Sequence, residues 1–287
     1  MNDRVSRSQL EPIALGDLQM EVGGSVGISL SPQDGSDPYI LLKRADMAMY
    51  DAKSSGQGAR FYEADIDTTS ARRLSMVSEL RAALAVGDIH VYVQPQADAR
   101  SGRAVTVEAL ARWGHPRLGS VSPEEFIPVA ERSGLIKPLT LAVLDASLAA
   151  VASWRDLGVG IAMNLSARSL LDTGLVEEVE ALLRKHDVPA DLLVLEVTES
   201  AVMVDPKRAI ALLCELQAMG VRLSVDDFGT GYSSLSYLKR LPVHEVKIDR
   251  SFVMGLTAGS EDYSIVRSIV DLGANFGLEV VAEGVED

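Results

Sequence analysis

Cysteine is nearly absent from this chain, since Cys214 is the only one among 287 residues. A single cysteine excludes a disulfide bond within the chain, and we therefore expect a reducing compartment, the cytoplasm. There are also only four histidines, and they do not combine with the cysteine into a zinc-binding pattern. The sequence therefore argues against a disulfide-stapled secreted fold and against a zinc site.

Positive charge is scarce as well, with 27 Lys and Arg against 41 Asp and Glu and a net charge of -14. No basic cluster stands out, so we expect neither a DNA nor an RNA polymer as partner. Continuous apolar runs are short, and residues 1–16 lack the apolar core of a signal peptide. We therefore expect no membrane segment in this chain, although a parent protein with further upstream regions can still be membrane-anchored.

The first sixty residues predict three elements. Residues 17–32 alternate like a strand and end in a turn at residues 33–35. An amphipathic helix follows and stops at Gly56, and residues 59–63 read as a short strand. Three elements are few for an independent core, so this region resembles a piece of a larger α+β domain.

From Ala71 onward, apolar strands alternate with amphipathic helices, which predicts an α/β fold with a mostly parallel sheet covered by helices. The expected strands are 89–96, 104–112, 159–166, 191–200, 221–229, 244–249 and 278–285. The expected helices are 73–85, 123–132, 137–157, 167–186, 205–219, 233–241 and 262–276. Seven strands fall one short of a closed eight-stranded barrel.

Oxygen-bearing side chains recur where these strands end. They are Glu108, Asn164, Glu196, Glu199, Asp226, Asp227, Asp249 and Glu283, and Lys247 lies among them. In a parallel barrel, the carboxyl ends of the strands open onto one face. Carboxylate and amide oxygens suit Mg²⁺ or Mn²⁺, and two adjacent aspartates are tolerable together where cations hold them. This pattern predicts a metal site.

Each of these residues also has a plainer interpretation. Asn164 or Ser166 could cap the following helix, and Lys247 with Asp249 could form an ordinary surface ion pair. The loop Gly229–Ser234 reads equally well as a flexible turn or as a mobile segment beside the site. Recurrence at the same end of successive strands favours the functional interpretation, because surface charges have no reason to follow that rule.

The motifs VEALARW, NLS, EVTES, DDFGTGYSSLSYL, VKIDRSF and VVAEGVE closely resemble the EAL family of cyclic di-GMP phosphodiesterases, from about Arg73 to Asp287. The resemblance implies a TIM-type (β/α)8-like barrel with one antiparallel strand. It also implies Mg²⁺- or Mn²⁺-dependent hydrolysis of cyclic di-GMP to linear 5'-pGpG through two metal ions, with Ca²⁺ expected to inhibit. The family's final strand, which bears a Gln-Gly pair, is not found after Asp287, and the activity of this chain by itself is left open.

The resemblance also assigns roles to individual residues. Glu108, Asn164, Glu196 and Asp226 would bind one metal, and Asp226 and Asp227 would reach the second. Lys247 would hold the attacking water and Glu283 would lie near it, so the catalytic set is Glu108, Asp227, Lys247 and Glu283. Substrate contacts would come from Gln94, Leu110 and Arg112. The supporting residues would be Glu199, which braces the loop at Gly229, and Asp249.

The motifs SVGISLSPQDG and KRADMAMYDAKSSG resemble the last part of a GGDEF, or diguanylate cyclase, domain. We therefore expect a GGDEF remnant at residues 1–66 and an EAL domain at residues 67–287. The signature loop of the cyclase is missing, so cyclase activity is not expected. The family also implies a homodimer through the DDFG-loop region. The alternative functions are a catalytically impaired cyclic di-GMP receptor and a regulatory domain that binds a protein partner.

Overall fold

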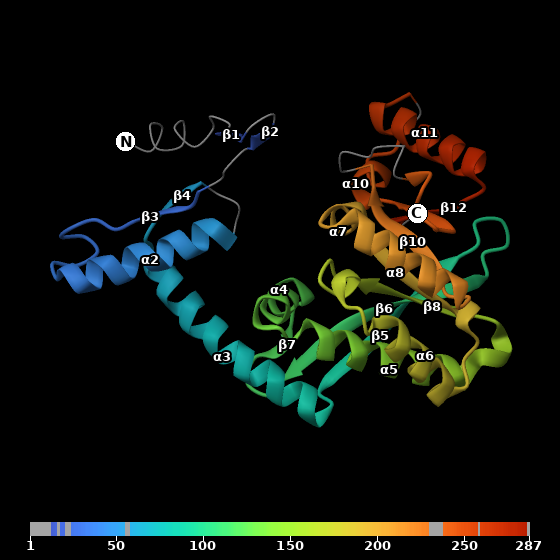
Figure 1. The fold of residues 1–287 in the computed structure, drawn as a ribbon, viewed down its shortest axis with the longest axis horizontal. Helices are drawn as coiled ribbons and strands as arrows, with labels where there is room; N and C mark the ends of the chain where they lie inside the picture. The colour runs from blue at the N-terminus through green and yellow to red at the C-terminus, as the bar shows by residue number, and fades with distance from the viewer. Residues whose placement is uncertain are drawn as a thin grey trace. The chain divides into compact units, whose positions relative to one another are not determined.

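The computed structural model describes residues 13–15, 18–20, 24–54, 58–229, 238–257 and 259–285. The chain divides into two compact units, Met1–Glu79 and Leu80–Asp287. One helix, α3 (Ala64–Val86), runs through this division (Figure 1) and through the domain boundary at residues 66 and 67 that the sequence predicts. That predicted boundary stays a prediction.

The first unit contains two small sheets and one helix. Strands β1 (Ile13–Leu15) and β2 (Leu18–Met20) pair antiparallel, and β3 (Val26–Ile28) pairs in parallel with β4 (Ala59–Phe61). Helix α2 (Pro38–Ser54) connects β3 to β4. The single strand predicted over residues 17–32 is wrong, because β2 and β3 are separate strands. Gly24 lies between them, and glycine weakens a strand.

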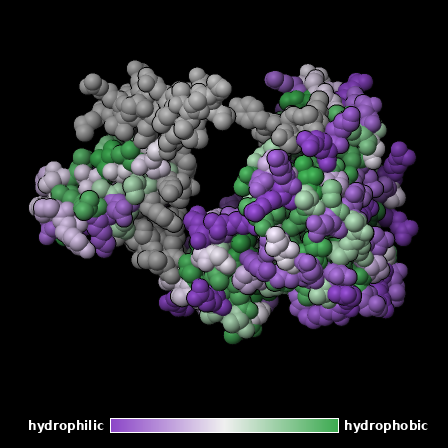
Figure 2. Space-filling view, viewed as in Figure 1, coloured by the Kyte–Doolittle hydropathy of each residue, from purple (hydrophilic) through white to green (hydrophobic). Residues whose placement is uncertain are grey.

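Close packing of α2 against β3 depends on Gly27. A Cβ atom at this position would lie 1.8 Å from the carbonyl oxygen of Ala45, so no larger residue fits there. Ala48 and Tyr62 are buried in the small core beneath the helix. Several large apolar side chains of α2 are nevertheless exposed, such as Tyr39 and Leu42, and Figure 2 shows hydrophobic residues on the surface of this unit.

The second unit is built around a curled, mostly parallel sheet with the strand order β12-β11-β10-β9-β8-β6-β5, and β7 pairs with β6. The strands are β5 (Ile89–Ala97), β6 (Ala104–His115), β7 (Gly119–Val121), β8 (Gly160–Leu165), β9 (Leu193–Thr198), β10 (Arg222–Phe228), β11 (Glu245–Ile248) and β12 (Glu279–Ala282). Strand β5 runs antiparallel to β6, and the five pairs from β6 to β12 are parallel. This confirms the predicted TIM-like architecture with an antiparallel strand. Within the described residues, β5 and β12 form the two edges of the sheet.

Helices cover the convex side of this sheet (Figure 1). They are α4 (Pro123–Ser133), α5 (Ile136–Trp154), α6 (Leu175–His186), α7 (Glu199–Met203), α8 (Pro206–Ala218), α10 (Arg250–Val253) and α11 (Glu261–Phe276). The central strands are apolar and buried, as in Ile161–Met163 of β8 and Leu193–Leu195 of β9. Strands of a parallel sheet that is covered by helices are buried on both faces, which explains why these strands are continuously apolar rather than alternating.

Two predicted helices differ from the structure. The helix expected over residues 167–186 is interrupted, since a 3-10 turn at Ser169–Leu171 precedes α6. The Asp172 side chain accepts a 3.0 Å hydrogen bond from the backbone N–H of Gly174, and this local turn competes with the helix. The helix expected over residues 233–241 lies mostly outside the described residues.

One segment, residues 136–157, is long and apolar enough to cross a membrane by length and composition alone. This finding does not overturn the expectation of no membrane segment, because a helix buried in a protein core passes the same test. Leu139, Val143, Leu148 and Val151 of this segment are buried within the protein. Their packing in the core accounts for the apolar composition.

Candidate functional site

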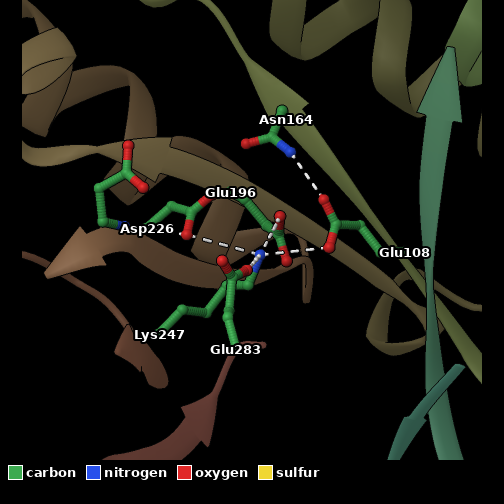
Figure 3. Close-up of polar contacts among 7 residues, drawn as sticks. Glu108, Asn164, Glu196, Asp226, Lys247 and Glu283 are labelled. Carbon is green, nitrogen blue, oxygen red and sulfur yellow. Dashed lines mark hydrogen bonds and ion pairs between the residues drawn. The ribbon is translucent and has the colours of Figure 1, made fainter. Parts of the chain in front are cut away.

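The carboxyl ends of the central strands bring six of the predicted site residues together (Figure 3). Glu108, Asn164, Glu196, Asp226 and Lys247 lie on β6, β8, β9, β10 and β11 in that order, and Glu283 directly follows β12. The register pairs Asn164 with Glu196, so neighbouring strands present these side chains at the same level. The residues are far apart in sequence, and it is the parallel sheet that gathers them.

The ammonium group of Lys247 lies at the centre of this cluster (Figure 3). Its Nζ atom is 2.6 Å from Glu283 Oε1 and 2.9 Å from Glu196 Oε2. It also lies 3.4 Å from Glu108 Oε2 and 3.5 Å from Asp226 Oδ1. Four carboxylates therefore face one positive charge, and we call these five residues the lysine cluster.

The centre of the lysine cluster is deeply buried, with 1% of Lys247 and none of Glu196 exposed, whereas Glu108 and Glu283 are partly exposed. Burial alone would lower the pKa of Lys247, but the carboxylates of Glu196, Asp226 and Glu108 outweigh it and raise this pKa, so the lysine stays protonated. Burial, followed by the repulsion of Glu108 and Asp226, raises the pKa of Glu196 to about 8 despite the attraction of Lys247. Burial also raises the pKa of Glu283. The cluster is thus short of positive charge.

Asn164 and Asp227 lie beside the lysine cluster. The side-chain amide of Asn164 donates a 3.1 Å hydrogen bond to Glu108 Oε1. Asp227 has a φ of 54°, and the pairing of β10 with β11 shifts register between Val225 and Phe228. Because a bulge of this kind re-aims side chains, the two adjacent aspartates do not simply alternate across the sheet. The backbone N–H of Asp227 donates a 2.9 Å hydrogen bond to Asp226 Oδ1.

Asp227 interacts with the neighbouring carboxyl group of Asp249. Burial, together with the negative charges of Asp226 and Asp249, raises the pKa of Asp227. Asp249 also caps α10, accepting a 2.9 Å hydrogen bond from the backbone N–H of Ser251. Glu199 is half-buried in the first turn of α7, immediately after β9.

Gly229 ends the described part of the DDFG loop and has a φ of 101°. This conformation favours glycine. A Cβ atom there would lie 3.3 Å from both Ile269 and Phe252, so the backbone also approaches α10 and α11 closely. Residues 230–237, which carry the rest of this motif, lie outside the described residues.

Gln94, Leu110 and Arg112 share one face of the β5–β6 ribbon with Glu108. Gln94 is paired directly with Glu108, and directly opposite residues of an antiparallel pair lie on the same face. Tyr92 is paired with Leu110 on this face, and the Arg112 guanidinium carbon lies 5.7 Å from the centre of the Tyr92 ring. Sequence reasoning missed Tyr92. The two-residue period from Gln94 along the strand could have found it.

The donors of the lysine cluster fit a divalent metal by chemistry and charge. All are hard oxygen ligands, four carboxylates exceed the one ammonium, and Glu196 Oε1 is buried with no hydrogen-bond partner. Within the part of the chain that the structure describes, however, no three acidic, His or Cys side chains already surround a common point. Lys247 lies between the carboxylates instead, so binding an ion requires them to turn toward it.

The chain was compared with known families and proteins. Residues 77–287 match the EAL domain, and residues 2–59 match the diguanylate cyclase, GGDEF domain. The bifunctional diguanylate cyclase/cyclic di-GMP phosphodiesterase MucR of Pseudomonas aeruginosa is 42% identical over 280 residues, which are 96% of this chain and 41% of the relative. The cyclic di-GMP phosphodiesterase NbdA of the same organism is 39% identical over 290 residues, covering 100% of this chain and 37% of the relative. The chain thus spans about two fifths of the length of these relatives.

A solved EAL-domain structure is also similar to this chain. The complex of the PaMucR phosphodiesterase with c-di-GMP superposes with a TM-score of 0.70 at 45% identity, covering 74% of this chain and 87% of that one. EAL-domain phosphodiesterases are generally dependent on divalent metals, in keeping with the oxygen donors of the lysine cluster. Since the matched residues 77–287 make up most of the chain and contain the whole lysine cluster, this chain belongs to the EAL-domain family, with a GGDEF-domain fragment at its N-terminus.

Proposed function

We propose that this chain hydrolyses cyclic di-GMP to linear 5'-pGpG. The observation that carries the proposal is the lysine cluster at the carboxyl ends of the strands, with its surplus of carboxylates and its unpartnered Glu196 oxygen. A phosphodiester carries negative charge that four carboxylates alone would repel. Cations are therefore needed before such a substrate can approach.

Mg²⁺ or Mn²⁺ supplies this charge when bound and lowers the pKa of a water molecule beside it. Glu108, Asn164, Glu196 and Asp226 would hold one ion, and Asp226 and Asp227 would hold the second. Ca²⁺ prefers more ligands and longer bonds, so we infer that it supports binding and blocks hydrolysis. Glu199 and Asp249 would support the loop at Gly229 and the second ion.

The chain's own residues have separate tasks in this mechanism. The oxygen of water attacks phosphorus in line, the bond from phosphorus to the 3' oxygen breaks, and that oxygen takes up a proton to become the 3' hydroxyl group. Lys247 is protonated and can donate a hydrogen bond to orient the water, but it cannot accept a proton. Glu283, whose pKa is raised by burial, is the carboxylate that would take the proton from the water. Gln94, Leu110 and Arg112 would contact the dinucleotide.

The test is chromatographic detection of pGpG from cyclic di-GMP with Mn²⁺, with an Asp226→Asn variant as control. We expect the wild-type chain to hydrolyse the substrate and the variant to lose more than about 100-fold of this activity. That loss exceeds what is expected when only a residue that supports a metal ligand is removed. Binding without turnover would favour the alternative of an impaired cyclic di-GMP receptor. Neither binding nor turnover would favour a regulatory domain that binds a protein partner.

We also infer a homodimer through the DDFG-loop region. A largely apolar groove of ≈ 350 Å³ lies beside Gly229, and Ile265, Ile269 and Leu272 of α11 line it. Sedimentation velocity should show a dimer that Ile265→Glu converts to a monomer, and an unchanged dimer would refute this assignment. The single cysteine supports a cytoplasmic location for this part of the protein.

A further inference from the structure

Tyr92 is a large aromatic side chain that the fold leaves 64% exposed. It lies on β5, where the register places it opposite Leu110 and two residues from Gln94, the partner of Glu108. Successive side chains of a strand alternate between faces, so Tyr92, Gln94, Leu110 and Glu108 share one face of the sheet. This is the face that carries the lysine cluster.

The direction of β5 determines where Tyr92 lies relative to that cluster. Because β6 is parallel to the central strands, moving from Glu108 to Leu110 leads toward their carboxyl ends. β5 is antiparallel, so the step from Gln94 back to Tyr92 leads the same way, by about 7 Å for two residues. Tyr92 therefore lies on the rim just beyond the Gln94–Glu108 pair.

Arg112 and Leu110 complete the surroundings of Tyr92. The guanidinium carbon of Arg112 lies 5.7 Å from the ring centre, within the range of a cation–π contact. The Arg112 side chain also donates a 2.9 Å hydrogen bond to the carbonyl oxygen of Ala111, which limits its freedom. The result is an aromatic ring beside a held positive charge, with most of the ring open to solvent.

We propose that Tyr92 is a substrate-binding residue, on which a purine base of the cyclic dinucleotide stacks while its phosphodiester lies over the lysine cluster. The inference rests on the proposed function and adds a specific contact to it. A base presents a flat π-face, and stacking on an exposed aromatic ring contributes to affinity without reading the identity of the base. The neighbouring guanidinium of Arg112 favours the anionic backbone of the same ligand.

Steady-state kinetics with cyclic di-GMP tests this role through Tyr92→Leu and Tyr92→Phe. Leucine keeps an apolar side chain on the strand but cannot stack, so we expect KM to rise about 10-fold or more with kcat changed less than about 3-fold. Phenylalanine keeps the ring and should stay within about 2-fold of wild type. Val93→Ala is the matched control, because Val93 is exposed on the opposite face of the same strand. An unchanged KM in Tyr92→Leu, with a wild-type melting temperature, would overturn the proposal.

A binding measurement with Ca²⁺ in place of Mg²⁺ or Mn²⁺, set beside a turnover assay with Mn²⁺, separates this inference from the proposed function. In Tyr92→Trp, titration with cyclic di-GMP should quench indole emission at the new position. The wild-type chain should show little change, because Trp113 is buried and Trp154 is hydrogen-bonded to Val159 before the start of β8, at the opposite end of the strands from the lysine cluster. Quenching with Ca²⁺ but no turnover with Mn²⁺ would defeat the hydrolase proposal and support the stacking role. Binding by calorimetry without quenching would defeat the stacking role alone, and absence of any binding would defeat both.

Discussion

Glu196 is a fully buried carboxyl group whose folded-state pKa of about 8 lies above its ordinary value of 4.5. In the unfolded chain this group loses its proton near the ordinary value, whereas in the folded protein it keeps the proton to higher pH. Unfolding therefore releases a proton between these values. Stability contributed by Glu196 is present at low pH and is lost as the pH rises from about 4.5 to 8.

We accordingly predict that, with divalent metals chelated, Glu196→Gln abolishes part of the pH dependence of unfolding. Between pH 5 and 8, the free energy of unfolding of the wild-type chain should fall relative to that of the variant by on the order of a few kcal/mol. Urea denaturation across this pH range measures the difference. Parallel curves for the two proteins would contradict the assignment of the raised pKa to Glu196.

Lys247 gives a second prediction at this scale. In Lys247→Met, four carboxylates lose the one cation that pairs with them among the described residues, and removing one partner from a buried ionic cluster costs about 3–5 kcal/mol. Part of the lost stability should return when Mn²⁺ is added, because the ion replaces the missing charge. Thermal melts with and without MnCl₂ measure both effects.

Lys185→Met provides the matched control. Lys185 Nζ lies 2.6 Å from Asp145 Oδ1, but both side chains are at least 40% exposed. An exposed pair contributes about 1 kcal/mol or less, and Mn²⁺ should not restore it. Equal losses in the two variants would show that burial of Lys247 carries no special cost.

At the scale of elements, α11 lies against β12 through Gly273. Alanine normally stabilises a helix by about 1 kcal/mol relative to glycine, but a Cβ atom at this position would lie 2.4 Å from Val280 Cγ2. Valine is stiff and cannot easily turn away. We predict that Gly273→Ala lowers the free energy of unfolding by about 1–2 kcal/mol, measured by chemical denaturation.

The control for this prediction is Val270→Ala on the same helix, since Val270 is 45% exposed. We expect a change within about 0.5 kcal/mol there. A stabilising Gly273→Ala would mean that the helix moves away from β12 at little cost.

Prediction from sequence succeeds at this scale wherever the pattern is local and repeated. The alternation of apolar strands and helices identifies seven of the eight strands from β5 to β12 and misses only the short β7. The oxygen donors at the strand ends come together because parallel strands end on one face. Residue spacing cannot show that Lys247 lies between the carboxylates, because its four partners come from four other segments. Nor could it show the register shift between Val225 and Phe228, which includes Asp226 and Asp227, since that depends on pairing with β11.

At the scale of the whole molecule, the net charge of -14 opposes the approach of an anionic dinucleotide. Salt screens this repulsion, since the Debye length falls from about 30 Å at 0.01 M to about 10 Å at 0.1 M. With Ca²⁺ at a fixed concentration in place of Mg²⁺ or Mn²⁺, we predict that the association rate constant of a fluorescent cyclic di-GMP analogue rises with KCl over this range. Stopped-flow mixing measures it. A rate that falls with salt would mean that the local field of Arg112 dominates the approach.

Helix α3 joins the two units and ends at Val86, only two residues before β5 begins at Ile89. Its 23 residues form an unbroken rod about 35 Å long. Gly87 and Asp88 alone separate this rod from the strand that carries Tyr92 and Gln94. A displacement of the last turns of α3, which belong to the second unit, would therefore reach this edge strand with just two intervening residues to absorb it.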